Sequence, residues 1–410
     1  MRKSSPELLI PAGDLEKLET AVRFGADAVY VGAGQFSLRA GQTSFTIDDL
    51  KQGVSFAHKH DVKVYLAMNI YAFDQDFPQM MEYLKKAVET GIDAIIISDP
   101  GLLSVVRRKY PKLKIHLSTQ ANTLNSEAVK FWHSHGVKRI VLGREVSLKQ
   151  AQKIKKAVPE VELELFIHGA MCISYSGRCL LSKHMTGRSA NRGECTQPCR
   201  WEYHLKETAR PNEDFGIEED SQGTYIMNSK DLCLIEHIPK LIEAGIDSFK
   251  VEGRMKSVYY AALVTKIYRQ AIDSYLKDPK SYKYNPQWKE ELQKVSHRRY
   301  TTGFYLGKET TEAIKSGGNV RDYTFVGTIE NYNPETRELE ILGRNYFAVN
   351  DELEIIDPEV EQISKIKVVK MRTADGQSIG KAHNGYHVVA VVEGTGEVSK
   401  FSLLRRKVTV

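Results

Sequence analysis

Residues 24–31 read FGADAVYV, and this stretch decides the predicted fold because its pattern returns along the chain. The clearest repeat is TGIDAIII at 90–97, and weaker copies are HGVKRIVL at 135–142 and AGIDSFKV at 244–251. In each copy a helical pattern precedes a glycine of the kind that ends helices, and a short apolar run follows it. An uninterrupted apolar run predicts a strand that is covered on both faces. The repeat therefore predicts helices that alternate with buried parallel strands.

Further apolar runs lie between these copies and supply the remaining predicted strands: Glu7–Ile10, Val62–Met68, Lys114–Ser118, Glu162–Ile167 and Tyr225–Asn228. A total of about eight or nine strands within residues 7–254 favours an α/β fold built as a (β/α)8 TIM-like barrel. The alternative, a doubly wound open sheet, predicts a glycine-rich dinucleotide loop after the first strand. The residues found there, Pro11-Ala12-Gly13-Asp14, do not form such a loop.

The pattern changes near residue 322, where short runs of alternating apolar and polar residues are separated by turn residues. This pattern is typical of a small all-β barrel. We therefore predict a (β/α)8-type catalytic domain with the cysteines at 1–276, a basic and aromatic linker at 277–321, and a small all-β domain at 322–410.

The composition is that of a soluble globular protein, with 41% hydrophobic and 27% charged residues in a chain of 410. No run approaches the ~18 apolar residues that a membrane span needs. The first residues also lack the apolar core of a signal peptide. These features predict a cytoplasmic protein without membrane contact. A net charge of +6 permits a polyanionic partner but does not require one.

Four of the five cysteines follow the predicted strand 162–167, in the order Cys172, Cys179, Cys195 and Cys199. Clustered cysteines in a cytoplasmic protein are ligands or catalysts more often than disulfides. Structural zinc is usually held by C-x2–4-C pairs, and only Cys195 and Cys199 are that close. The wider spread favours an iron–sulfur cluster, with zinc and nucleophilic thiols as alternatives. Cys233 is an alternative fourth ligand.

Polar residues end nearly every predicted strand, and the C-terminal ends of barrel strands line the active site. The candidate substrate-binding residues are Arg39, Asn69, Gln120, Arg144 and Arg254. The candidates for proton transfer or orientation are Glu164, His168 and Glu252. Arginine presents bidentate donors to carboxylates, so the arginines suit an anionic ligand. Surface salt bridges are the alternative role of each arginine, and a structural role is the alternative for Glu164.

The cysteine window resembles the signature of peptidase family U32. The matching residues are Glu164-x-Phe166-x-x-Gly169-Ala170-Met171-Cys172, followed by Gly177-x-Cys179-x-Leu181-Ser182. The resemblance extends along the chain through LLIPAGD at 8–14, GADAVYVG at 25–32, STQANT at 118–123, NSKDL at 228–232, KVEGRMKS at 250–257 and SHRRYTTGFY at 296–305. Motifs of this length and number exclude a chance match.

The resemblance implies an activity and a cofactor. The family is named for collagenase-like proteolysis, and it also groups oxygen-independent hydroxylation proteins that carry a [4Fe–4S] cluster. One branch converts the wobble uridine of tRNA to 5-hydroxyuridine with prephenate as co-substrate, another hydroxylates a cytidine of 23S rRNA, and a third acts on a ubiquinone precursor. The length, the C-terminal domain and CTQPCRW at 195–201 are most similar to the tRNA branch.

The resemblance thus implies a cluster on Cys172, Cys179, Cys195 and Cys199, with tRNA and a small dicarboxylate metabolite as partners. A second U32 protein or a second copy of the chain is a further predicted partner. Two cationic stretches, 277–300 and 400–407, are the candidate RNA contacts, and a solvated linker and an ordinary tail are their alternative roles. Proteolysis, hydroxylation of another substrate and a zinc-stabilised scaffold are the alternative functions.

Overall fold

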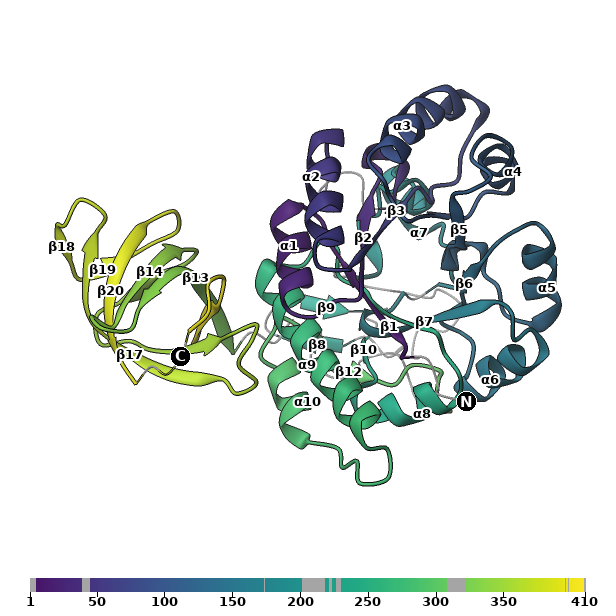
Figure 1. Ribbon diagram of the computed structural model, residues 1–410. Coiled ribbons are helices and arrows are strands. Elements are labelled where there is room, and N and C mark those ends of the chain that lie inside the picture. The colour runs from purple at the N-terminus through teal and green to yellow at the C-terminus, as the bar shows by residue number, and fades with distance from the viewer. Residues whose placement is uncertain are drawn as a thin grey trace.

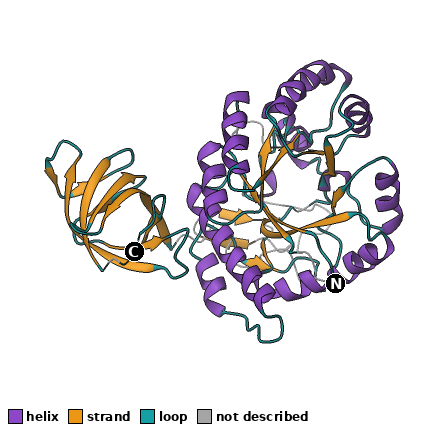
Figure 2. Ribbon diagram, in the orientation of Figure 1, coloured by secondary structure: helices purple, strands orange, loops and turns teal. Residues whose placement is uncertain are grey.

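The computed structural model describes residues 5–38, 45–172, 174–200, 218–220, 223–225, 230–307, 322–394, 396 and 398–408. Within these ranges eight parallel strands form a closed barrel (Figures 1 and 2). The strands are β1 (Glu7–Pro11), β2 (Ala28–Gly32), β3 (Lys63–Ala67), β4 (Ala94–Ile97), β5 (Lys114–Leu117), β6 (Arg139–Val141), β7 (Glu162–Ala170) and β11 (Ser248–Val251). The ring closes because β11 pairs in parallel with both β1 and β7. The predicted TIM-like barrel is confirmed.

Helices cover the outside of this ring (Figure 2). They are α1 (Leu15–Arg23), α2 (Ile47–His58), α3 (Phe77–Glu89), α4 (Pro100–Lys109), α5 (Ser126–Ser134), α6 (Leu148–Ala157), α8 (Ile238–Glu243) and α9 (Val258–Lys277). The repeated glycines end helices as predicted, and Gly25 and Gly91 have φ of 99° and 90°, which favours glycine. None of the helices in the described ranges is long and apolar enough to span a bilayer.

One predicted barrel strand, Tyr225–Asn228, is wrong. Residues 223–225 form β9 (Gly223–Tyr225), which pairs with β8 (Glu218–Asp220) in a separate antiparallel hairpin, and 226–229 lie outside the described residues. The eighth barrel strand is instead β11. A further short strand, β10 (Asp231–Cys233), runs antiparallel to the end of β7 and lies outside the ring.

The C-terminal domain is a closed antiparallel barrel, as predicted. Its six main strands are β13 (Tyr323–Asn333), β14 (Glu338–Gly343), β16 (Glu352–Ile356), β17 (Ser364–Thr373), β20 (His387–Glu393) and β21 (Leu403–Lys407). They pair in the order β16-β21-β13-β14-β20-β17, and β16 with β17 completes the circuit. Three short strands lie between the main strands in the chain, and they are β15 (Phe347–Ala348), β18 (Ser378–Ile379) and β19 (Lys381–Ala382). A hydrophobic core of its own fills this barrel.

The described part of the predicted linker, 277–307, packs against the first domain. It contains α10 (Pro286–Leu292) and β12 (Tyr300–Thr301), and β12 pairs with β10. Trp288 and Leu292 are buried in the core of the first domain. The two domains meet at α9 and α10, where the buried Arg405 guanidinium of β21 lies 2.6 Å from Glu291 and donates to the Tyr259 hydroxyl at 3.2 Å.

Candidate functional site

A cavity of about 230 Å³ lies at the C-terminal ends of the barrel strands. Several of the predicted site residues line it, and they come from segments far apart in the sequence: Asn69, Gln120, Arg144, Cys172, Cys195, Cys199, Glu252 and Arg254. This is the position at which TIM barrels place their active sites. Arg39, the remaining predicted substrate-binding residue, lies outside the described residues.

The cysteine segment is held against the mouth of the barrel by several polar contacts. The Ser176 amide donates to Glu145 Oε1 at 2.9 Å, and Arg192 forms an ion pair with Asp76 at 2.7 Å. The Tyr71 hydroxyl donates to the carbonyl of Gly177. Glu145 follows β6, whereas Tyr71 and Asp76 follow β3, so loops from different strands fix the segment. The cysteines are therefore positioned by the barrel itself.

Gly177 is the point of closest approach between the cysteine segment and the barrel. Its φ of 76° lies in the region that favours glycine. A Cβ at this position would lie 2.2 Å from the Gln120 carbonyl oxygen, which is closer than any side chain can come. The glycine of the family signature thus allows the loop between Cys172 and Cys179 to rest on the end of β5.

Two of the cysteine thiols are in direct contact. The pKa of Cys179 is lowered to about 5, first by the hydrogen bond from Cys172 and further by hydrogen bonds from Ser174 and from the amides of Leu181 and Ser182. The partner thiol of Cys172 has a raised pKa, first because of the same hydrogen bond and then because of burial. Thiolate is the form of cysteine that binds metal. The surroundings of Cys179 thus favour the thiolate form that metal binding requires.

The four cysteines predicted as metal ligands lie at or beside the cavity. Cys172, Cys195 and Cys199 line one cavity, and Cys179 contacts Cys172. Among the described residues, no three Cys, His, Asp or Glu side chains are close enough together to hold one metal ion. Cysteine thiolates are the usual ligands of iron–sulfur clusters, so these four residues are the candidates for holding one.

Cys233, the alternative fourth ligand, lies apart from the cavity. It belongs to β10 and is buried against α9, with its Sγ 3.9 Å from the Tyr268 hydroxyl. Burial raises the pKa of this thiol to about 11. The structure therefore places Cys233 in a core layer behind β7, where a thiol acts as a small apolar side chain.

Cationic side chains surround the cavity. The Arg144 guanidinium lies 3.9 Å from the centre of the Phe166 ring, and its Nη2 is 3.9 Å from Glu252 Oε2. The buried Arg254 donates from Nη2 to Ser37 Oγ at 3.2 Å. Two buried atoms of the cavity residues, Gln120 Oε1 and Arg144 Nε, have no hydrogen-bond partner among the described residues. Buried polar atoms are normally satisfied, so these two favour a polar ligand.

Lys250 also lines the cavity, and the sequence reasoning missed it. Its Nζ lies 2.7 Å from Glu164 Oε1 and 4.5 Å from the centre of the Tyr30 ring. The signal was present in the motif KVEGRMKS, because a lysine inside a buried strand is rarely tolerated without a partner. Among the described residues that line the cavity, Lys250, Lys256, Arg144 and Arg254 are cations and Glu252 is the one carboxylate.

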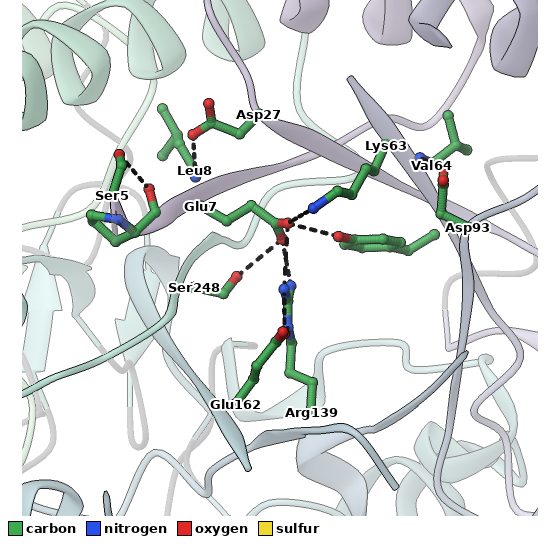
Figure 3. A network of polar contacts seen from close by, with 12 residues as sticks. Ser5, Glu7, Leu8, Asp27, Lys63, Val64, Asp93, Arg139, Glu162 and Ser248 are labelled. Atoms are coloured by element: carbon green, nitrogen blue, oxygen red, sulfur yellow. Dashed lines mark hydrogen bonds and ion pairs between the residues drawn. The ribbon is translucent and has the colours of Figure 1, made fainter. Parts of the chain in front are cut away.

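Glu164 and His168, two of the predicted catalytic residues, do not line the cavity. Glu164 is fully buried in a polar network inside the barrel, where it contacts Lys250 at 2.7 Å, Ser248 at 3.1 Å and Arg139 at 3.4 Å. The same network includes Glu7, which Arg139, Lys63 and Ser248 approach from different strands (Figure 3). Burial raises the pKa of Glu7, but the charge and hydrogen bond of Arg139, the hydrogen bond from Tyr65 and the charge of Lys63 together outweigh burial, so the pKa is lowered.

His168 faces the outer layer instead of the cavity. Its Nδ1 lies 3.3 Å from the Tyr268 hydroxyl, and the rings of Tyr260 and Tyr300 are also in contact. Burial lowers its pKa to about 3, so the imidazole is neutral. The neutral imidazole thus packs between β7 and the tyrosine side chains of α9, and it does not line the cavity.

Comparison with known proteins identifies both domains. The model of peptidase family U32 matches residues 13–315, and the model of the peptidase family U32 C-terminal domain matches residues 321–405. The tRNA hydroxylation protein P1 of Bacillus subtilis is 42% identical over 94% of this chain and 91% of its own length. The tRNA hydroxylation protein P of Escherichia coli is 38% identical over 86% of both chains. A collagenase of Porphyromonas gingivalis is 32% identical over 93% of both chains.

Proposed function

This chain belongs to peptidase family U32, and we propose that it is an RNA-modifying enzyme of that family that hydroxylates tRNA. The proposed product is 5-hydroxyuridine at the wobble position, formed without molecular oxygen in the cytoplasm. The relatives named as tRNA hydroxylation proteins, similar over nearly the whole chain, support hydroxylation of tRNA. The observation that carries the proposal is the cationic cavity whose wall contains cysteines at the mouth of the barrel.

We further propose that Cys172, Cys179, Cys195 and Cys199 hold a [4Fe–4S] cluster. When bound, such a cluster supplies one-electron chemistry next to the cavity. The depressed pKa of the Cys179 thiol and the shared cavity of the other three cysteines support this ligand set. Zinc remains the alternative metal, but the lack of three close ligands among the described residues is less favourable to a single ion.

The cavity's own residues suit a small dicarboxylate such as prephenate. Arg144 and Arg254 can each present two parallel donors to a carboxylate, and the Lys250 ammonium adds a point charge on the floor. Glu252 can accept a hydrogen bond from a ligand hydroxyl, and Asn69 and Gln120 supply neutral polar contacts. The cysteine segment closes one side of the cavity and limits the access of water to the ligand.

Proteolysis is the second candidate, and the collagenase of similar sequence favours it. A cysteine protease needs a histidine base beside its thiol. Among the described residues no histidine lines the cavity, and His168 faces the opposite side of β7. The cavity geometry therefore supports hydroxylation more than proteolysis.

The test is the modified-nucleoside content of tRNA, measured by mass spectrometry. A strain that lacks this protein is expected to lose 5-hydroxyuridine and its derivatives, and the wild-type gene is expected to restore them. A gene carrying Arg254→Met should fail to restore them although the protein accumulates normally. If the deletion leaves these nucleosides unchanged, the tRNA assignment is wrong. Degradation of gelatin by the purified protein, abolished in Cys172→Ala, would favour proteolysis instead.

A further inference from the structure

Positive charge is concentrated in one part of the first domain. Residues 100–157 contain 13 lysines and arginines but only Glu127 and Glu145 as acidic residues, so this segment carries +11. The whole chain carries only +6, which means that the remainder is net negative. The segment runs from α4 to α6, three consecutive helices on one side of the barrel (Figure 1). The charge is thus a local property of that side.

Nine of these cations are exposed and have no acidic partner among the described residues. They are Arg107, Arg108, Lys109, Lys112, Lys114, Lys138, Lys149, Lys153 and Lys156, which together we call the basic face. Like charges that are crowded together repel one another, and no internal ion pair offsets this cost. A surface of this kind favours a polyanion as partner.

The two stretches that the sequence suggested for RNA contact, 277–300 and 400–407, differ from the basic face because they contain cations with acidic partners. In the first stretch, Lys289 pairs with Glu236 and Arg298 with Asp231, at 2.5 and 2.6 Å. In the second, Arg405 is buried between Glu291 and Glu354 and Arg406 pairs with Asp351. Part of the positive charge of both stretches is thus neutralised within the chain, whereas none of the nine cations of the basic face has an acidic partner among the described residues.

A groove between α4 and α5 adds aromatic surface to the basic face. It has a volume of about 570 Å³, and Arg107, Arg108, Phe131, Trp132 and His135 are among its lining residues. The Phe131 side chain is 53% exposed, and its ring lies 5.1 Å from Trp132 and 4.4 Å from His135. Exposed rings beside guanidinium groups form the stacking platforms that proteins use for unpaired bases.

We propose that the basic face binds the backbone of tRNA at a distance from the reacting base and that the groove takes an unpaired base of the same RNA. This inference rests on the proposed function. Residues 107–112 and Lys138 precede β5 and β6, and Lys114 is the first residue of β5, so these cations lie at the end of the barrel opposite the cavity. They cannot contact the nucleotide in the cavity, and their partner is the body of the tRNA. An acidic protein would match the charge but does not need the aromatic groove.

The test compares two quadruple variants in the binding of intact tRNA by fluorescence anisotropy over a range of salt concentrations. The face variant combines Arg107→Ala, Arg108→Ala, Lys153→Ala and Lys156→Ala. The matched control combines Lys51→Ala, Lys59→Ala, Lys277→Ala and Lys280→Ala, which are exposed, unpaired within the described residues and outside the basic face. Both variants lose the same net charge, and circular dichroism confirms that both fold.

The face variant is expected to bind tRNA about tenfold more weakly or worse at 0.1 M salt. The slope of log binding constant against log salt concentration should be smaller in magnitude by about 2 to 3, because each lost phosphate contact reduces that slope by nearly one. The control should change less than about threefold. A third variant, Phe131→Ala, should weaken binding about fivefold without changing the slope, because stacking releases no counterions.

Equal losses in the face and control variants, or an unchanged affinity of the face variant, would overturn the inference. Loss of binding to phosphatidylserine vesicles by the face variant, with tRNA binding intact, would assign the face to a membrane and also overturn it. The nucleoside measurement on the deletion strain tests the proposed function separately, because it uses the wild-type protein alone. The nucleoside measurement can thus support hydroxylation while the binding measurement contradicts the inference about the basic face. The binding measurement can equally support the basic face while the nucleoside measurement contradicts hydroxylation.

Discussion

Lys250 Nζ and Glu164 Oε1 lie 2.7 Å apart inside the barrel, at the boundary between the cavity and the polar network beneath it. Lys250 lines the cavity, whereas Glu164 is fully buried and also contacts Arg139 and Ser248. The pair therefore connects the cavity to the buried polar network that joins the barrel strands. A ligand carboxylate would meet an ammonium whose position is already fixed by Glu164.

The network gives Glu164 a role in the stability of the folded protein. Glu164→Ala leaves Lys250 and Arg139 with too little negative charge in a buried site, and we expect it to lower the free energy of unfolding by about 3–5 kcal/mol. Urea denaturation followed by circular dichroism measures this loss. Glu162→Ala is the matched control, because Glu162 pairs with the same Arg139 at 2.7 Å but is 50% exposed. It should cost no more than about 1 kcal/mol, and equal costs would contradict this role for the network.

The close approach at Gly177 predicts a specific loss of the proposed cluster. In Gly177→Ala the added Cβ meets the Gln120 carbonyl, so we expect the cysteine loop to move away from the barrel and iron binding to fall to a small fraction of the wild-type level. Gly187→Ala tests the backbone effect alone, since Gly187 has a similar φ of 74° but no atom within 4 Å of the added Cβ. It should cost about 1–2 kcal/mol of stability and retain iron. Iron content and absorbance near 400 nm after anaerobic purification distinguish the two.

The placement of the cysteines predicts two classes of serine variant. Cys172→Ser, Cys179→Ser, Cys195→Ser and Cys199→Ser are each expected to lose most of the iron, because each removes a proposed ligand. Cys233→Ser should retain the iron and lose about 1–3 kcal/mol of stability, because a hydroxyl replaces a buried thiol. Iron assays on all five proteins measure the outcome. Retention of iron in Cys199→Ser together with loss of iron in Cys233→Ser would show that Cys233, and not Cys199, is a ligand.

The buried His168 predicts sensitivity to acid. Its pKa of about 3 in the folded protein lies below the ordinary value of 6.5, so the unfolded chain binds more protons and stability falls as pH drops from about 6.5 toward 3. This one residue should remove about 2 kcal/mol between pH 6.5 and 4.5. In His168→Gln the acid-side slope of stability against pH should be shallower by that amount. Identical slopes in His168→Gln and the wild-type protein would contradict the assignment.

Sequence reasoning identified the architecture because the decisive pattern is local. Each copy of the repeat joins a helix end, a glycine and a strand in fewer than ten residues, and covered parallel strands have to be apolar throughout. The predicted strand at 225–228 is not part of the ring, because β7 pairs directly with β11. The true eighth strand, β11, carries its own copy of the repeat at 244–251 and closes the ring.

The sequence by itself determined the barrel, the C-terminal β domain and the position of the cysteines after β7, since these follow from local pattern and chain order. Only the tertiary structure decided which polar side chains face the cavity. An irregularity between Lys250 and Val251 shifts the pairing of β11 with β7 by one residue, so that Val251 pairs with His168. Lys250, which pairs with Phe166 before this shift, lines the cavity, whereas His168 beyond the shift packs against α9. Whether a side chain points inward depends on strand pairing and closure, which no local pattern specifies.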